Sequence, residues 1–154
     1  MNGKEEVNDM KRLCIVIIII VAMLGCSGCV SYEVFRAHFN GKLSSHNAFV
    51  LSSYDELREH IDKYDDSFTE RLYYELRSYD EDYFKDNKLI LLYHTEITSS
   101  NTIKVKDVRY SNGVADVILT RREPDVKTQA MQDYVIIVEI PQKENCISAT
   151  YEFE

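Results

Sequence analysis

Two cysteines near the N-terminus, Cys26 and Cys29, are placed for covalent chemistry because they closely follow an apolar run. The run, residues 13–24, has twelve residues, whereas a helix that crosses a bilayer needs about 20 apolar residues. Its length instead matches the apolar region of a secretory signal peptide. Met10-Lys11-Arg12 supplies the basic start of such a signal, which favours Met10 as the true start and residues 1–9 as an upstream extension.

The tetrapeptide Met23-Leu24-Gly25-Cys26 resembles the lipobox of bacterial lipoproteins, in which the cysteine receives a diacylglycerol and becomes the new N-terminus. This predicts a signal peptide over residues 1–25 and a lipid on Cys26. Cys29 is an alternative lipid site. A further alternative is an ordinary secretory signal in which the cysteines are incidental. Because two acyl chains anchor a protein stably, the protein is expected on the extracytoplasmic face of the cell membrane.

The remaining motifs give no metal or cofactor. Cys29 and Cys146 could form a disulfide in an oxidising compartment or remain two unpaired thiols. The chain after the signal has no cysteine pair with matching histidines for a zinc finger. The acidic stretch 79–87 lacks the central glycine and terminal glutamate of a calcium-binding EF-hand loop, and the first turn of a helix accounts for its charges.

Composition indicates one acidic domain. The formal net charge of -8 excludes nucleic acid as the expected partner. Residues 26–46 mix polar and apolar types without a sustained period, which predicts a flexible tether with one short strand near residues 32–35. Residues 47–154 are then expected to form a single globular domain, with 11 tyrosines and 6 phenylalanines in the whole chain supplying much of the core.

The first half of this domain has helical patterns. Ser53 and Glu56 form a capping box before an amphipathic helix, and Ser67 and Glu70 form a second box before another helix that ends near residue 78. Residues 78–87 predict a further short helical turn.

The second half alternates with period two, as strands do. Asn112-Gly113 predicts a two-residue hairpin, and a phase shift predicts a bulge near Lys106 and Asp107. Strands joined without long helices favour antiparallel pairing. The fold class is therefore α+β: a mostly antiparallel sheet of about five strands with the two amphipathic helices on one face. The predicted strands are residues 48–51, 89–96, 102–110, 114–122, 133–140 and 147–153.

Residues 79–142 carry a family resemblance. Three features carry it: the aromatic acidic turn that ends at Asn87, the hairpin at Asn112-Gly113, and the segment from Pro124 through Thr128-Gln129-Ala130-Met131 into the strand "YVIIVEIP". Together they resemble the C-terminal domain of the protease complex subunit PrcB family, which comprises small secreted or lipid-anchored bacterial proteins. The chain departs from the family at 98–102, where members often have a glycine-rich turn. The resemblance implies a non-catalytic subunit that binds or stabilises an extracytoplasmic protease.

Two functions remain open. The four histidines, His38, His46, His60 and His94, form no catalytic motif, and the short motifs of common hydrolases, metalloproteases and nucleotide-binding proteins do not occur. The first hypothesis is a non-catalytic accessory module, not an enzyme, that contacts an envelope protein or protease through a sheet face or the loops 97–102 and 122–132. The alternative is a small-ligand or minor enzymatic domain. Its pocket between helices and sheet would be lined by Tyr73, Tyr74, Tyr83 and His94.

Overall fold

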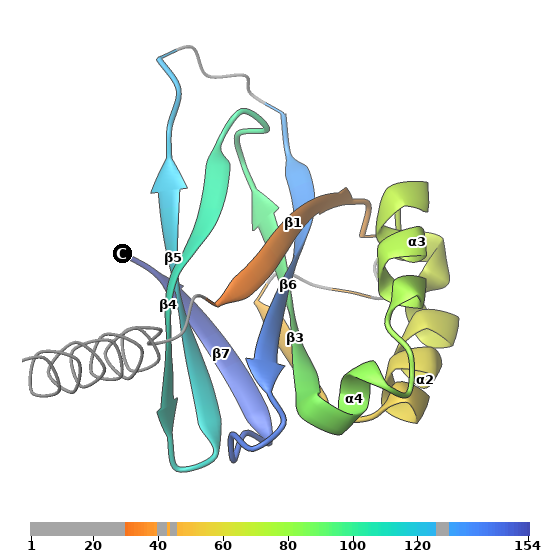
Figure 1. Ribbon diagram of the computed structural model, residues 1–154. Helices are drawn as coiled ribbons and strands as arrows, with labels where there is room; N and C mark the ends of the chain where they lie inside the picture. Colours follow the sequence, from red (N-terminus) through yellow and green to blue (C-terminus); the bar gives the residue numbers. More distant parts are fainter. Residues whose placement is uncertain (1–29, 40–42, 44–45, 126–129) are drawn as a thin grey trace, which may run out of the picture.

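A four-stranded sheet forms the centre of the molecule in the computed structural model, which describes residues 30–39, 43, 46–125 and 130–154 (Figure 1). Its strand order is β1-β6-β3-β2, and every neighbouring pair is antiparallel. A second sheet of three strands has the order β4-β5-β7. The strands are β1 (Ser31–Ala37), β2 (Asn47–Leu51), β3 (Asn87–Glu96), β4 (Thr102–Ser111), β5 (Val114–Arg122), β6 (Gln132–Pro141) and β7 (Ser148–Phe153).

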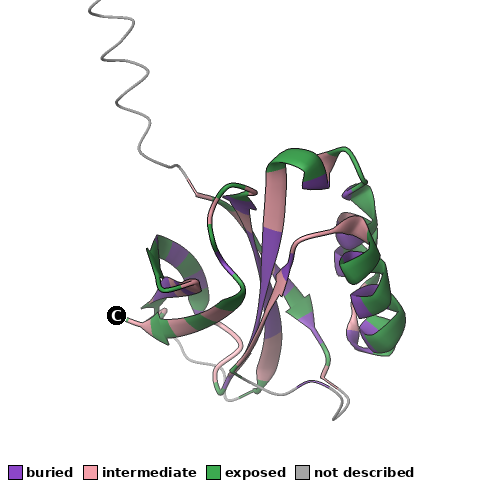
Figure 2. Cartoon of the chain, turned by 90° about the horizontal axis from the view of Figure 1, so that it is seen from below, coloured by how far each residue is buried: buried purple, intermediate pink, exposed green. Residues whose placement is uncertain are grey.

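The helices cover one face of the four-stranded sheet, and the three-stranded sheet covers the other (Figure 1). They are α2 (Tyr54–Tyr64), the 3-10 turn η1 (Asp65–Ser67), α3 (Glu70–Ser78) and α4 (Tyr83–Asp86). Figure 2 shows their buried residues turned toward the sheet and their exposed residues turned away. No helix in the described ranges combines the length and the apolar character needed to cross a membrane.

The central strands β3 and β6 are apolar on both sides because each contributes to two cores. In β3, Leu89, Leu91 and Tyr93 pack on the helix side, whereas Ile90 and Leu92 pack on the side of the second sheet. All five are fully buried. An uninterrupted apolar run is what a strand buried on both faces requires, and the strand predicted at residues 89–96 is confirmed.

The predicted α+β class is confirmed, but the detailed arrangement is wrong. The described residues form seven strands in two sheets rather than about five in one, and three α-helices rather than two. One unexpected pair is parallel: β5 and β7 run in the same direction, from Val114 opposite Ser148 to Leu119 opposite Phe153. Between them the chain passes through β6, which lies in the other sheet and returns it to the starting end of β5. The connection between these parallel strands is therefore made by a strand, whereas the prediction assumed that it requires a long helix.

Residues 31–37 also depart from the prediction. They were assigned to the flexible tether of residues 26–46, yet all of β1 pairs with β6, from Ser31 opposite Glu139 to Ala37 opposite Asp133. Phe35 and Ala37 are buried. The short strand expected near 32–35 is thus confirmed and longer than predicted, whereas the signal peptide, Cys26 and Cys29 lie outside the described residues.

Local backbone signals in the second half are confirmed. Asn112 and Gly113 have φ angles of 52° and 80°, as the tight hairpin between β4 and β5 requires. The register of β4 shifts between Val105 and Asp107, at the predicted bulge.

The two predicted helix caps have different outcomes. Ser53 caps α2, because its hydroxyl accepts a hydrogen bond from the backbone N–H of Glu56. The cap of α3 is Thr69 and not Ser67, which lies in η1. Thr69 Oγ1 accepts from the backbone N–H of Leu72 at 3.4 Å and donates to the carbonyl oxygen of Arg36 in β1 at 3.0 Å.

Replacing Thr69 by alanine is therefore expected to lower the free energy of unfolding by about 1 to 2 kcal/mol, because an N-cap and a contact to β1 are lost together. Urea unfolding followed by circular dichroism measures the change. Thr69→Ser retains both hydrogen-bonding atoms and is expected to stay within about 0.5 kcal/mol of the native protein. Equal stability of the alanine and serine variants would contradict this role.

Candidate functional site

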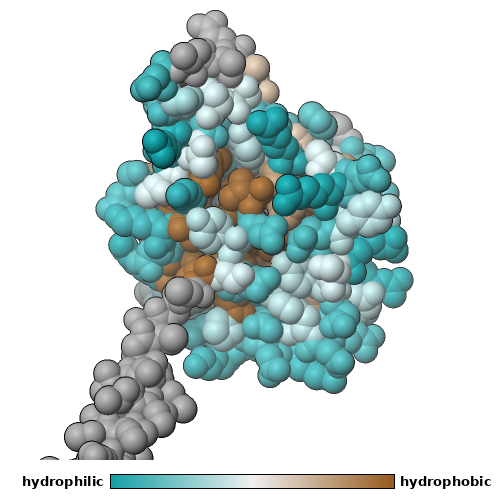
Figure 3. All heavy atoms as spheres, turned by 45° about the horizontal axis from the view of Figure 1, so that its top comes forward, coloured by the Kyte–Doolittle hydropathy of each residue, from teal (hydrophilic) through white to brown (hydrophobic). Residues whose placement is uncertain are grey.

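A groove lies between the edge strand β1, the start of α3 and the start of β4. Its volume is about 510 Å³, within the range of roughly 300 to 1,000 Å³ found for ligand sites. Figure 3 shows apolar atoms at the centre of this end of the molecule, inside a ring of hydrophilic ones. We call it the β1–β4 groove; its lining residues are Val34, Phe35, Arg36, Thr69, Arg71, Asn101, Thr102, Ile103 and Tyr134.

Three of the apolar lining residues, Phe35, Ile103 and Tyr134, are buried in the two cores. They come from β1, β4 and β6, so both sheets build the groove. Burial raises the pKa of Tyr134, although the guanidinium of Arg36, which hydrogen-bonds this tyrosine, works in the opposite direction. The Tyr134 hydroxyl donates to the backbone oxygen of Ser99, which ties the loop before β4 to the groove.

Arg36 and Arg71 provide positive charge at the groove. The guanidinium of Arg71 lies 5.3 Å from the centroid of the Phe35 ring. Neither arginine forms an ion pair in the part of the chain that the structure describes. Arg71 does interact electrostatically with the carboxylate of Glu75. In a chain with a formal net charge of -8, two arginines outside ion-pair distance of a described carboxylate make this groove a candidate site for an anionic group.

Asn101 supplies a hydrogen-bond acceptor that is not used. Its side-chain nitrogen donates to Glu96 Oε2 at 3.0 Å, and because a carboxylate can only accept, the other amide atom must be the oxygen. This Oδ1 is buried and has no hydrogen-bond partner among the described residues. Asn101 as a whole is 8% exposed, so this acceptor lies below the molecular surface of a residue that lines the groove.

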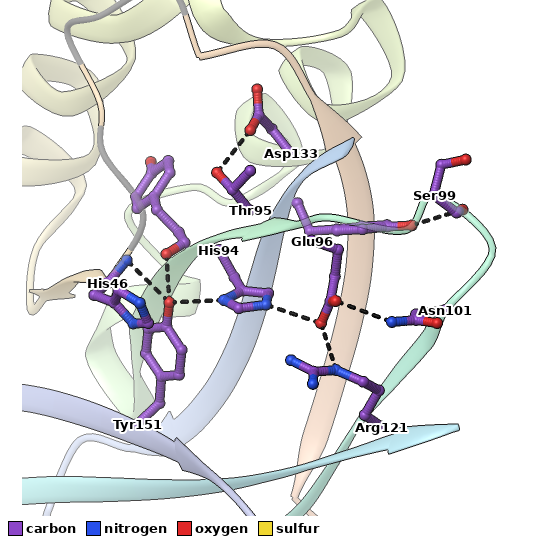
Figure 4. Close-up of polar contacts among 11 residues, drawn as sticks. His46, His94, Thr95, Glu96, Ser99, Asn101, Arg121, Asp133 and Tyr151 are labelled. Carbon is purple, nitrogen blue, oxygen red and sulfur yellow. Dashed lines mark hydrogen bonds and ion pairs between the residues drawn. The ribbon is translucent and has the colours of Figure 1, made fainter. Parts of the chain in front are cut away.

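Glu96 fixes the orientation of Asn101 from behind. Its carboxylate is buried and also accepts from His94 Nε2 at 2.9 Å and from Arg121 Nε at 2.8 Å, as Figure 4 shows. Burial acts to raise the pKa of Glu96, but the hydrogen bonds from His94, Asn101 and Arg121 outweigh it, so the pKa lies below its usual value. Glu96 is therefore a charged anchor for three side chains, which come from β3, β5 and the loop before β4.

The same network continues to β7 through His94. His94 Nδ1 lies 3.2 Å from the hydroxyl of Tyr151, which donates to the carbonyl oxygen of Tyr93 at 2.7 Å and accepts from the backbone N–H of His46 at 3.0 Å (Figure 4). Burial lowers the pKa of His94, and the neighbouring Glu96 offsets part of this. His94 Nε2 donates its proton to Glu96, because a carboxylate can only accept. The single hydroxyl proton of Tyr151 goes to the Tyr93 carbonyl, so it is not available to His94 Nδ1.

The structure does not bring the four residues of the predicted helix–sheet pocket together. His94 follows Ile90 and Leu92 on the face away from the helices, where its ring contacts Phe153 of β7 at 4.7 Å. Tyr73 and Tyr74 lie on α3, and Tyr74 is 66% exposed. Tyr83 lies on α4 and packs against Tyr79. The prediction is wrong because alternation along an apolar strand does not reveal which face its histidine occupies.

Helix packing leaves little space where that pocket was expected. A cavity of about 70 Å³ lies between α2 and α3, with Leu57, Ile61 and Leu76 in its lining. This volume is far below that of ligand sites.

Two other predicted contact regions do lie at hollows. The loop 97–102 contributes Asn101 and Thr102 to the β1–β4 groove. Thr102 also lines a neighbouring hollow of about 320 Å³ with Arg122 and Pro124, from the predicted loop 122–132. The sequence did not single out Phe35 and Arg36, which fall in the predicted tether, or Arg71, which falls in the second predicted helix. The alternation of β1 residues was the available signal for the first two.

Metal binding gains no support from the described residues, in which histidine, cysteine, aspartate and glutamate form no cluster of three suited to an ion. Cys146 is buried and has no disulfide partner within the described residues, and burial raises its pKa. Its predicted alternative partner, Cys29, lies outside the described residues.

Comparisons with protein-family models, curated proteins and solved structures found no match to this chain. The site is therefore interpreted from its own geometry: apolar walls and two arginines.

Proposed function

We infer that the protein is a lipid-anchored extracytoplasmic accessory module that binds a partner protein through the β1–β4 groove without catalysing a reaction. The observation that carries this proposal is the joint presence of Arg36 and Arg71 beside apolar walls in one groove of ligand size. The arginines attract and orient an anionic partner, and the groove includes Asn101 and Thr102 from the predicted contact loop 97–102.

Membrane attachment through Cys26 would restrict where the partner can be. Val34 stands eight residues after Cys26, and an extended chain spans about 3.5 Å per residue, so the groove would lie within about 28 Å of chain from the anchor. A partner that reaches the groove must then itself be close to the membrane surface. An envelope protein fits this position, and the resemblance of residues 79–142 to the PrcB family favours a protease.

A second candidate is a small-ligand or minor enzymatic domain that uses the same groove. Its volume of about 510 Å³ favours this candidate, because it would hold a drug-sized molecule. The helix–sheet location is no longer part of this alternative, since the cavity between α2 and α3 is about 70 Å³.

Cross-linking in intact host cells tests the proposal. The tagged full-length protein is compared with Cys26→Ala, with the double variant Arg36→Gln/Arg71→Gln, and with Arg77→Gln, a control on α3 outside the groove lining. One envelope protein should be enriched by the native form and by Arg77→Gln. Capture should fall at least about tenfold in the double variant, since a loss of about 1.4 kcal/mol already gives that factor.

The anchorless Cys26→Ala form should also lose the partner, because it no longer concentrates at the membrane. Capture that is unchanged in the groove double variant would contradict binding through the groove. If the native form captures no specific partner, the small-ligand candidate would be favoured instead.

A further inference from the structure

The apolar lining defines the first requirement on a ligand. Phe35, Ile103 and Tyr134 supply apolar surface at the groove. Asn101 Oδ1 is not within reach of a ligand, because it is buried and its amide is held by the hydrogen bond from Nδ2 to Glu96. The ligand therefore carries apolar groups.

The two arginines define the second requirement. A guanidinium presents several N–H donors in a planar fork that matches carboxylate or phosphate oxygens. Arg36 and Arg71 come from different elements, β1 and α3, and converge on one groove. The ligand therefore also carries an acidic group.

The position of the groove along β1 defines the shape. Val34, Phe35 and Arg36 are consecutive, and successive side chains of a strand point to opposite faces. A single groove can contact all three side chains only if it runs along one edge of β1. β6 pairs with one edge of β1, so the groove lies along the opposite edge. The free edge of a sheet pairs readily with an extended peptide.

One end of this edge is already closed. The carbonyl oxygen of Arg36 accepts the Thr69 hydroxyl, and the N–H of His38 donates to the carbonyl of Ser67. An added strand would therefore lie beside residues 31–35, with its acidic side chain toward the arginines. The apolar walls formed by Phe35, Ile103 and Tyr134 favour a peptide over inorganic phosphate, which offers no apolar surface.

We propose that the β1–β4 groove binds an extended peptide segment of a partner protein whose internal aspartate or glutamate contacts Arg36 and Arg71. This rests on the proposed function, since it names the chemical class of the partner's contact segment.

Pools of randomised hexapeptides test the proposal directly. All have blocked ends and differ only at one central position, which is glutamate, glutamine or lysine; a fourth pool has central glutamine and a free C-terminal carboxylate. The full-length protein in detergent is immobilised, and the bound fraction of each pool is quantified by mass spectrometry. We expect at least about tenfold enrichment of the glutamate pool over the glutamine pool, as a charge-assisted contact to arginine implies.

Variants distinguish recognition from general stickiness. Arg36→Gln/Arg71→Gln should abolish the preference for glutamate, and Arg77→Gln should retain it. Arg71→Glu should favour the lysine pool, a gain that misfolding cannot produce. The preference of the native protein should also weaken as salt rises, because the pairs lie at an accessible groove.

Each contrary result has a distinct meaning. Equal retention of the glutamate and glutamine pools would overturn the acidic requirement while leaving a peptide-binding groove. Retention of only the pool with a free carboxylate would overturn the internal segment in favour of a chain terminus. If no pool is retained, the inference fails, and capture of a groove-dependent partner in cells decides separately whether the proposed function survives.

Discussion

Replacing Glu96 by alanine is expected to lower the free energy of unfolding by about 3 kcal/mol, because removal of one member of a buried charged network leaves its partners uncompensated. The side chain of Glu96 is 2% exposed and accepts from His94, Asn101 and Arg121. The side chain of Arg121 is 36% exposed, so water can solvate its charge in part once Glu96 is removed. The expected loss of stability is therefore at the low end of the range for buried ion pairs. Urea unfolding measures the loss, provided that the dependence of the unfolding free energy on urea concentration is the same in both proteins.

Glu96→Gln is the matched variant. It retains the shape and one acceptor oxygen but removes the charge, so its loss should be smaller, about 1 to 2 kcal/mol. The Asn101 amide should lose its fixed orientation in both variants, and peptide binding at the β1–β4 groove should weaken with it. A loss of stability below about 1 kcal/mol for the alanine variant would show that the network contributes little.

Acidification from pH 6.5 to pH 4 is expected to destabilise the protein through His60. Burial, with a smaller contribution from Lys63, lowers the pKa of His60 from 6.5 to about 4. The unfolded chain therefore binds a proton in this interval that the folded chain does not, and stability falls as pH falls. At 1.36 kcal/mol per pKa unit the full effect is about 3 kcal/mol, present above pH 6.5 and lost by about pH 4.

The surroundings of His60 explain why protonation is unfavourable. His60 Nε2 lies 2.5 Å from the hydroxyl of Tyr93, which is fully buried, and the ring packs against Phe49 and Tyr64 with centroids 4.8 Å away in each case. A neutral ring can accept the proton of the Tyr93 hydroxyl at Nε2. A charged ring cannot, and nothing in this contact set carries a compensating negative charge.

Unfolding free energies measured at pH 7 and pH 5 test this expectation. His60→Gln should reduce the difference between the two values, even though it lowers stability at both. His94 acts in the same direction because burial also lowers its pKa, so some dependence should persist in that variant. His38→Gln, at an exposed side chain, should behave like the native protein; identical pH dependence in His60→Gln would exclude His60 as the source.

Features set by neighbouring residues could be predicted from the sequence. The Ser53 cap, the Asn112-Gly113 hairpin and the bulge before Asp107 all depend on a few adjacent residues, and all three are confirmed. The displaced cap of α3 shows the limit of this reasoning. Ser67 and Thr69 are both good capping residues. Thr69 is the one that caps the helix, and its hydroxyl also donates to β1, which is distant in the chain.

The candidate site could not be predicted because distant segments build it. Arg36 joins Arg71 and Asn101 only when β1 pairs with β6 and the two sheets stack. His94 illustrates the same difficulty, since the run from Leu89 to Tyr93 is apolar on both faces and the local pattern cannot assign a direction. The predicted loop 97–102 does contribute Asn101 and Thr102 to the groove, because a loop at a strand end lies at the edge of the sheet whichever face the strand residues occupy.

The pairing of β1 with β6 has a consequence for folding kinetics. Val34 faces Ile136, so the first described strand must wait during synthesis for a strand near the end of the chain. Contacts of such large sequence separation form slowly. The helical layer can condense earlier, but the wall that contains Arg36 is among the last parts to assemble. A nascent chain interrupted before β6 would therefore leave the core side chains of β1, Phe35 and Ala37, without their partner strand, which makes prompt completion of synthesis a protection against aggregation.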